Sequence, residues 1–160
     1  MTLRDRTTGW LNNQTHAGIR ELLLHTTARY QLHCPAYCLM PDHGHFLWMG
    51  LNSDSDQLKA ARFFRRQWNS LLSQFESKLQ PQGYDHVLRE EERHPEEFED
   101  TVLYIFRNPQ RAKLVDDWND WPYLGAIVPG YPDLPYSPVI KFWPRFWKIH
   151  NRECSRLNPS

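Results

Sequence analysis

Two histidines stand two residues apart within residues 39–50, which read Leu-Met-Pro-Asp-His-Gly-His-Phe-Leu-Trp-Met-Gly. Side chains alternate between the two faces of a β-strand, so we expect His43 and His45 on the same face of a sheet. Two neutral imidazoles that lie this close form half of a metal site, and imidazole suits manganese, zinc, iron and nickel. The alternative is one surface histidine and one hydrogen-bonded core histidine. A second chemical group from elsewhere in the chain would favour the metal interpretation.

A tyrosine on the polar side of a predicted helix supplies such a group. In the helix expected to begin near Pro95, the polar side carries four residues at steps of four, four and three: Asp100, Tyr104, Asn108 and Arg111. Because Pro109 disfavours helix at the residue before it, we expect Tyr104 in the last turn before a break, with Asn108 capping the next helix. The tyrosine hydroxyl would then be reachable from outside. A half-buried packing tyrosine is the alternative.

The elements that must position these groups follow from hydrophobic periodicity. We predict a helix over 15–30 capped by Asn13 or Thr15, strands over 36–40 and 43–50 joined by a tight turn, a helix after the polar loop 53–56, and a strand over 84–89. Residues 1–6 are expected to form the end of a short strand. With the helix from Pro95, this order matches an α+β fold: a ferredoxin-like antiparallel sheet with helices and an added helix that carries Tyr104.

The length and composition bound the class of protein. The 160 residues suit one domain with a real core, which we place at 1–117, followed by an aromatic and basic C-terminal tail at 118–160. Lys+Arg and Asp+Glu both total 19, so the net charge predicts no particular partner. Cys34, Cys38 and Cys154 fit neither zinc-finger spacing nor a disulfide framework, and no apolar run is long enough for a signal peptide or a membrane span. We therefore expect a cytoplasmic protein with no membrane partner.

Three segments together resemble a known family. Met-Pro-Asp-His-Gly-His at 40–45, Tyr-Ile-Phe-Arg-Asn-Pro-Gln-Arg-Ala-Lys-Leu-Val at 104–115 and Trp-Pro-Tyr at 121–123 resemble the single-tyrosine HUH transposases, most closely the REP-associated tyrosine transposase branch. Residues 85–89, Asp-His-Val-Leu-Arg, match a segment typical of that branch. The resemblance covers the chain from Leu22 to Tyr123.

The resemblance implies a role for each group. His43 and His45 correspond to metal ligands, Tyr104 to the nucleophile, and Asn108 to the residue that completes the metal site, with Mg or Mn as the divalent cofactor. The implied reaction is cleavage and rejoining of single-stranded DNA beside a hairpin of a REP-like palindrome, through a 5′-phosphotyrosine. A tyrosine hydroxyl is mostly protonated at neutral pH, so positive charge from the ion or Arg107 would favour the attacking phenolate. Such an enzyme would act as a monomer or a homodimer.

Candidate DNA contacts are basic side chains and one histidine: Arg62, Arg65, Arg66, Arg107, Arg111 and His86. The first three gather with Lys59 on the outer side of the helix after residue 56, where a solvated helix face is the alternative. In the tail, aromatic side chains alternate with Arg and Lys, a composition that suits either stacking on bases or packing on the sheet.

Two positions depart from the family's pattern. The residue between the histidines, usually a bulky hydrophobe, is Gly44, so the strand loses a core side chain and gains backbone freedom. The usual asparagine before the first histidine is Asp42, which adds a carboxylate near the ion. One alternative function is therefore a transposase-derived DNA-hairpin-binding protein with little or no catalysis. Another is a binding module without catalysis, in which Tyr84 and His86 stack on bases.

Overall fold

The computed structural model describes residues 1–81, 95–132, 134–137 and 139–158. In chain order its elements are α1 (Asn13–Arg29), β1 (Leu32–Met40), β2 (His43–Gly50), α2 (Gln57–Leu72), α3 (Pro95–Phe106), α4 (Asn108–Arg111), β3 (Leu124–Ile127) and α5 (Val139–Leu157). Short 3₁₀ segments lie at Arg4–Arg6, Ser73–Phe75 and Trp118–Asp120. The strand predicted over 84–89, with Tyr84 and His86, lies outside the described residues.

The sheet is antiparallel, with strand order β2-β1-β3. The predicted hairpin is present: β1 and β2 pair from Met40 with His43 outward, across a turn at residues 41 and 42. The first strand is longer than the expected 36–40, and both of its pairings shift register around Pro35. Proline lacks the N–H that a ladder needs, which explains the irregularity. The α+β class and the antiparallel sheet are as predicted.

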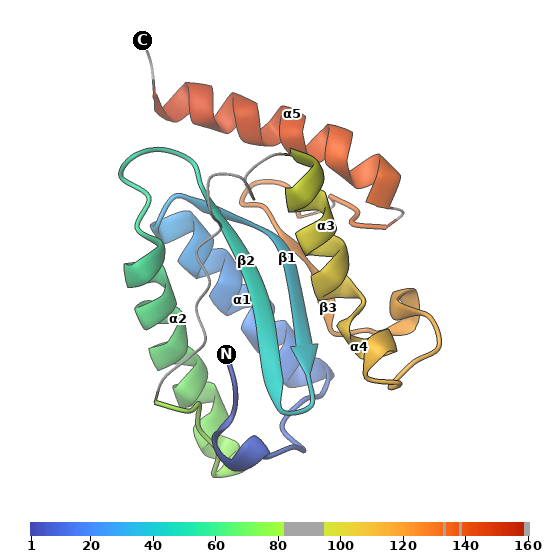
Figure 1. Cartoon of the computed structure of the whole chain (residues 1–160). Helices are drawn as coiled ribbons and strands as arrows, with labels where there is room; N and C mark the ends of the chain where they lie inside the picture. Colours follow the sequence, from blue (N-terminus) through green and yellow to red (C-terminus); the bar gives the residue numbers. More distant parts are fainter. Residues whose placement is uncertain (82–94, 133, 138, 159–160) are drawn as a thin grey trace.

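The sheet lies between two helical layers (Figure 1). One face packs on α1 and α2 through a cluster that includes Ile19, Leu23, Tyr37, Phe64, Trp68 and Leu72. The other face packs on α3 and α5 through a cluster that includes Ala36, Cys38, Phe98, Val102, Phe142 and Phe146. Because β1 contributes to both clusters, all nine of its residues are buried.

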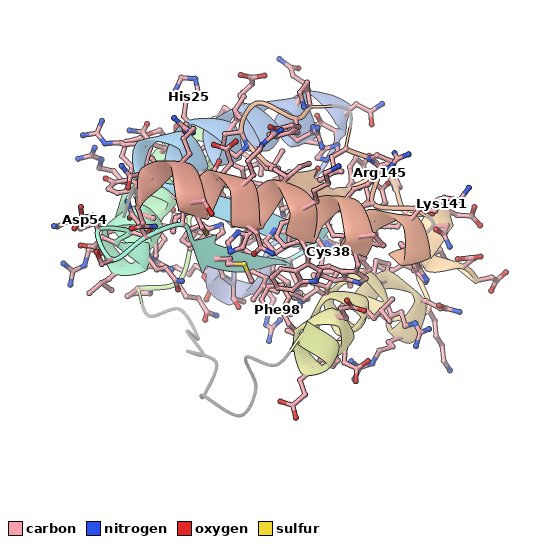
Figure 2. The ribbon with its side chains drawn as sticks, turned by 90° about the horizontal axis from the view of Figure 1, so that it is seen from above. His25, Cys38, Asp54, Phe98, Lys141 and Arg145 are labelled. Atoms are coloured by element: carbon pink, nitrogen blue, oxygen red, sulfur yellow. The ribbon has the colours of Figure 1, made fainter. Side chains whose placement is uncertain are left out.

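The C-terminal segment contributes two elements that the sequence did not predict. β3 pairs with β1 and forms the second edge of the sheet. Figure 2 looks down on α5, which lies across the molecule with Cys38 and Phe98 close to it. The aromatic side chains of α5 form part of the second cluster, although the boundary between residues 117 and 118 stays a prediction. Within the described ranges, no helix combines the length and apolarity needed to cross a membrane.

The helix α1 begins two residues before the predicted range of 15–30, and its cap differs from both predicted candidates. Asn12, and neither Asn13 nor Thr15, caps the helix: its side-chain oxygen accepts from the backbone N–H of Thr15 at 3.0 Å. The Thr15 hydroxyl in turn accepts from the backbone N–H of Asn12 at 2.9 Å, which completes a reciprocal capping box. The helix predicted after loop 53–56 is present as α2 and is capped by Asp56, which accepts from the N–H of Lys59 at 2.8 Å.

Close packing requires a glycine at position 44. This corrects the expectation that Gly44 leaves the core without a side chain that it needs. A Cβ atom built on Gly44 would lie 2.9 Å from ring atoms of Phe46 and Trp68. Those two rings belong to the first core cluster and meet edge to face with centroids 5.5 Å apart. The volume that a bulky residue would fill is therefore already occupied by neighbouring aromatic side chains.

We expect Gly44→Val to destabilise the fold by about 1–3 kcal/mol, because the new methyl groups force two packed rings to move. Urea unfolding measures the loss. Gly18→Ala is the matched control, since a Cβ there meets only the Leu71 methyls at 3.4 Å and lies in the interior of α1. That variant should be neutral or slightly stabilising. Equal stability of the wild type and Gly44→Val would contradict the packing argument.

Two buried histidines join the sheet to α5. His33 of β1 is 1% exposed and His150 of α5 is 8% exposed, and their Nδ1 atoms lie 3.3 Å apart. Burial is the main cause that lowers the pKa of His33 from 6.5 to about 4. The charge of His150 lowers this pKa further, and the charge of Glu153 partly opposes the shift. Burial also lowers the pKa of His150. Both rings are therefore neutral in the folded protein at pH 7.

Stability should fall as the pH drops from 6.5 to 4. Between these pH values the folded state binds fewer protons than the unfolded state, because folding lowers the His33 pKa from 6.5 to about 4. The contribution of neutral His33 to the free energy of unfolding is therefore complete above pH 6.5 and is lost as the pH falls toward 4. Urea unfolding at several pH values measures the decline, which should be shallower in His33→Gln. His25→Gln, at an exposed position (Figure 2), serves as the control and should keep the wild-type slope. A wild-type slope in His33→Gln would show that other groups cause the decline.

Candidate functional site

The two histidines of β2 lie on one face of the sheet, as their spacing predicts. Their Nε2 atoms are 3.1 Å apart, and the rings meet edge to face with centroids separated by 4.9 Å. Two imidazole nitrogens that each bind one ion at about 2.0–2.1 Å, at angles between a right angle and a tetrahedral angle, lie about 2.8–3.4 Å apart. The spacing of His43 and His45 therefore fits two ligands of a single ion.

His45 is held in the neutral form that a metal ligand needs. Its pKa is lowered from 6.5 to about 4, first by burial and then by the positive charges of His43, the N-terminal ammonium group and Arg111. A metal ion competes with protons for the imidazole nitrogen, so a ring that is already neutral at pH 7 loses nothing by deprotonation.

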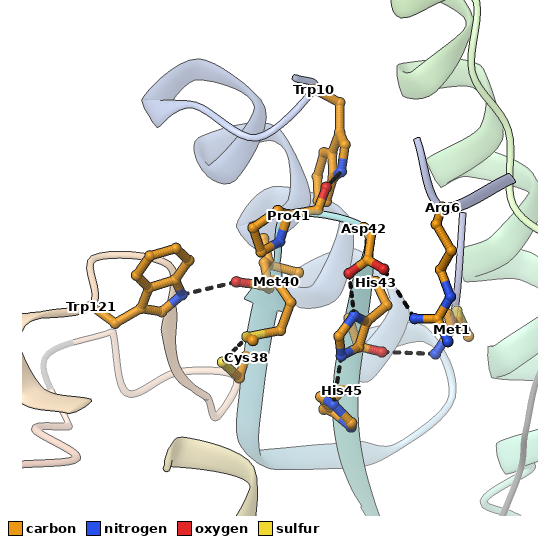
Figure 3. A network of polar contacts seen from close by, with 12 residues as sticks. Met1, Arg6, Trp10, Cys38, Met40, Pro41, Asp42, His43, His45 and Trp121 are labelled. Carbon is orange, nitrogen blue, oxygen red and sulfur yellow. Dashed lines mark hydrogen bonds and ion pairs between the residues drawn. The ribbon is translucent and has the colours of Figure 1, made fainter. Parts of the chain in front are cut away.

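Asp42 and Arg6 extend the histidine pair into a chain of polar contacts (Figure 3). His43 Nδ1 lies 2.6 Å from Asp42 Oδ1, and the Arg6 guanidinium donates to Asp42 Oδ2 at 3.0 Å. Partial burial raises the pKa of the Asp42 carboxyl, but the hydrogen bonds from His43 and Arg6 outweigh it and the net shift is downward. Sequence reasoning missed Arg6, because no local pattern connects a residue near the N-terminus with the turn between β1 and β2.

Tyr104 lies near the end of α3, with 52% of its surface exposed. The other side of the same helix is buried, since Phe98, Val102 and Ile105 are each less than 7% exposed. The Arg111 guanidinium stacks over the Tyr104 ring, with its carbon 4.4 Å from the ring centroid. The tyrosine is therefore reachable from outside, as predicted, and has a positive charge beside it.

Asn108 plays a different structural role from the predicted one. It is the first residue of α4 rather than its cap, because Arg107 occupies the cap position. Its side-chain nitrogen donates to the carbonyls of Tyr104 at 3.0 Å and Ile105 at 3.1 Å. These bonds satisfy carbonyl groups at the end of α3 and leave the amide oxygen on the opposite branch of the side chain. That oxygen is the type of ligand that Mg and Mn accept.

Arg111 connects the two halves of the site. It stacks on Tyr104, and its charge also contributes to the lowered pKa of His45. The α3 helix packs on the sheet face that carries the histidines, since its core side chains join the same cluster as Leu47 and Met49 of β2. In the described part of the chain, His, Cys, Asp and Glu side chains form no group of three that could hold an ion.

The candidate DNA contacts are divided between the two faces. Arg107 and Arg111 belong to the segment that carries Tyr104, whereas Arg62, Arg65 and Arg66 belong to α2 on the opposite side of the sheet. Arg65 is already engaged, because its guanidinium donates to the backbone carbonyls of Gln80 and Pro81. Arg66 lies over the Phe63 ring at 5.9 Å. His86, the sixth candidate, lies outside the described residues.

Removing the charge of Arg111 should raise the pKa of His45 above its value of about 4, because that charge disfavours the imidazolium form. An NMR titration of the His45 ring in Arg111→Gln measures the shift. Arg107→Gln removes a cation from the same segment and should leave the titration unchanged. An unchanged His45 pKa in Arg111→Gln would place α4 away from β2.

Comparison with known proteins finds sequence similarity to proteins named as REP-associated tyrosine transposases. No protein-family model matches the chain. A REP-associated tyrosine transposase of Haemophilus influenzae is 26% identical over 136 residues, which is 77% of this chain and 74% of the relative. The REP-associated tyrosine transposase of Escherichia coli K12 is 23% identical over 129 residues, 77% of this chain and 71% of the relative.

A solved structure shares the fold. It is described as a REP-associated tyrosine transposase bound to a REP hairpin, and it aligns with a TM-score of 0.62 at 22% identity over 77% of this chain and 71% of the other. The sequence matches confirm the resemblance to the REP-associated tyrosine transposases, and the solved structure shows that the fold is shared.

Proposed function

We propose that this protein cleaves and rejoins single-stranded DNA beside a hairpin, with Tyr104 as the nucleophile and a divalent ion, Mg or Mn, as the cofactor. The observation that carries the proposal is that Arg111 links an exposed tyrosine to the histidine pair. Its guanidinium lies over the Tyr104 ring, and its charge lowers the pKa of His45, one of two histidines spaced for an ion. The relatives are named as transposases, and the structural relative is described as bound to a REP hairpin. We extend that substrate class to this chain.

His43, His45 and Asn108 would hold the ion. The Nε2 atoms of the two histidines already face each other at a distance that suits a shared ion, and the Asn108 amide oxygen would supply a ligand from α4. Bound by these residues, an ion would supply Lewis-acid chemistry that reduces the negative charge on the phosphate under attack. The carboxamide is held in place by its bonds to the end of α3.

Tyr104 would form the covalent link to DNA. The Tyr104 hydroxyl gives up its proton to solvent as its oxygen attacks the phosphorus. The bond from phosphorus to the 3′ oxygen breaks, and the 3′ oxygen takes a proton from solvent to become a free 3′-hydroxyl. The Arg111 guanidinium over the ring and Arg107 on the same segment would place positive charge beside the anionic phosphate. The phosphotyrosine keeps the energy of the broken bond, so a 3′-hydroxyl can reverse the reaction.

Use of one tyrosine limits how two strands are exchanged. Each protein molecule makes one covalent link at a time, so excision at two ends requires either two subunits or two events in sequence. A monomer and a homodimer both satisfy this requirement.

Gly44 gives no reason to prefer a binding protein without catalysis. The position between the histidines is filled by the rings of Phe46 and Trp68, so the strand that carries both ligands is packed rather than loosened. Hairpin binding without catalysis is therefore one of the outcomes that the covalent-adduct assay distinguishes.

Tyr104→Phe should abolish the covalent adduct, because the substitution removes only the attacking oxygen. The assay incubates the protein with Mn²⁺ and an oligonucleotide that carries a hairpin and a single-stranded flank, and resolves the product on a denaturing gel. The wild type should give a DNA-linked band, and mass spectrometry should locate the linkage on Tyr104.

Tyr30→Phe is the matched control, since that tyrosine lies on the other side of the sheet, 5.9 Å from the Phe63 ring. It should form the adduct at the wild-type rate. An undiminished adduct in Tyr104→Phe would overturn the proposed nucleophile. Hairpin binding by the wild type without any adduct would instead support the binding protein.

A further inference from the structure

We propose that Asp42 is a positioning residue for His43: its carboxylate holds the proton of the ring on Nδ1, so that Nε2 carries the lone pair that faces His45. The inference rests on the proposed metal site, and it assigns a task to a residue that differs from the asparagine usual at this place in the family. Asp42 is thus not itself a metal ligand in this arrangement.

The geometry leaves Asp42 few other orientations. Its two carboxylate oxygens have separate partners, Oδ1 facing His43 Nδ1 at 2.6 Å and Oδ2 facing Arg6 at 3.0 Å (Figure 3). Its backbone carbonyl accepts from the N–H of Leu3 at 2.9 Å. The preceding carbonyl, of Pro41, accepts from the indole N–H of Trp10 at 2.7 Å. Contacts from both sides therefore fix the turn and the direction of its carboxylate.

The chemistry of the contact selects one tautomer of His43. An ionised carboxylate only accepts hydrogen bonds, so the nitrogen that faces it must carry the proton. The Nε2 atom of a neutral His43 is then an acceptor, and it faces His45 Nε2 at 3.1 Å. Since metal-binding imidazoles commonly donate their other N–H to a carboxylate, which fixes the ring and raises its basicity, the arrangement prepares His43 for an ion.

Arg6 makes the carboxylate difficult to replace. A guanidinium only donates hydrogen bonds, so an asparagine at position 42 would turn its oxygen toward Arg6 and its NH₂ group toward His43 Nδ1. The ring would then carry its proton on Nε2, where it blocks the lone pair. In this chain, therefore, the isosteric amide should disturb the site, because Arg6 is present beside it.

The test compares Asp42→Asn with Asp54→Asn, an isosteric change at an exposed carboxylate in the loop before α2. Long-range ¹H–¹⁵N spectra of the metal-free protein report which nitrogen of His43 is protonated, and Mn²⁺ titration followed by electron paramagnetic resonance reports affinity. We expect Nδ1–H in the wild type and in Asp54→Asn, and Nε2–H in Asp42→Asn. We expect Asp42→Asn to bind Mn²⁺ about 10–100-fold more weakly.

Two results would overturn the inference: an Nε2–H tautomer of His43 in the wild type, or wild-type Mn²⁺ affinity in Asp42→Asn. The wild-type spectrum decides the matter even if the variant fails to fold. Because that spectrum is recorded without metal or DNA, it is also independent of the nicking reaction. A wild type that shows Nδ1–H but binds no Mn²⁺ would leave Asp42 as the residue that positions His43 and would overturn the proposed metal-dependent function instead.

Discussion

The antiparallel pairing of β1 with β2 is the constraint on which the candidate site depends. β1 is buried along its whole length because helices cover both faces of the sheet. Its pairing therefore fixes the register of β2 and decides which β2 side chains point to each face. A shift of one residue would exchange the two faces of β2 and send the histidines into the aromatic cluster of Phe46 and Trp68. Core packing thus holds the two imidazoles on the side where α3 ends.

The break between α3 and α4 carries the other half of the candidate site. Pro109 is buried in the short helix that follows, and the Asn108 side chain binds the last carbonyls of α3. The chain changes direction there, so that Arg111 returns over the Tyr104 ring. A continuous helix would keep the two residues on a common stripe, but it would not offer an amide oxygen at a helix junction. The irregular geometry at the end of α3 is therefore what brings several kinds of polar group together.

Polar groups on the histidine side of the sheet form a sequence of contacts rather than a set of isolated charges. Arg6 binds Asp42, Asp42 binds His43, and His43 faces His45. Each member limits the orientation of the next, and the first comes from a segment that is remote in sequence. Such an arrangement holds the ring nitrogens in place at little entropic cost when a ligand arrives, because the side chains are already ordered.

Local sequence patterns were enough to predict the hairpin, the helices α1, α2 and α3, the common face of His43 and His45, and the exposure of Tyr104, because each follows from local periodicity or from a proline. It did not reveal β3, α5 or the contact of Arg6, and it assigned Asn108 to the wrong side of a helix boundary. Those features depend on partners far away in the chain: β3 is short and is stabilised by pairing with β1, and α5 buries its aromatic stripe only against the assembled sheet. Gly44 shows the difference most clearly. The glycine can be read from the sequence, but the reason for it, two rings 2.9 Å from where a Cβ would lie, exists only once the tertiary structure has formed.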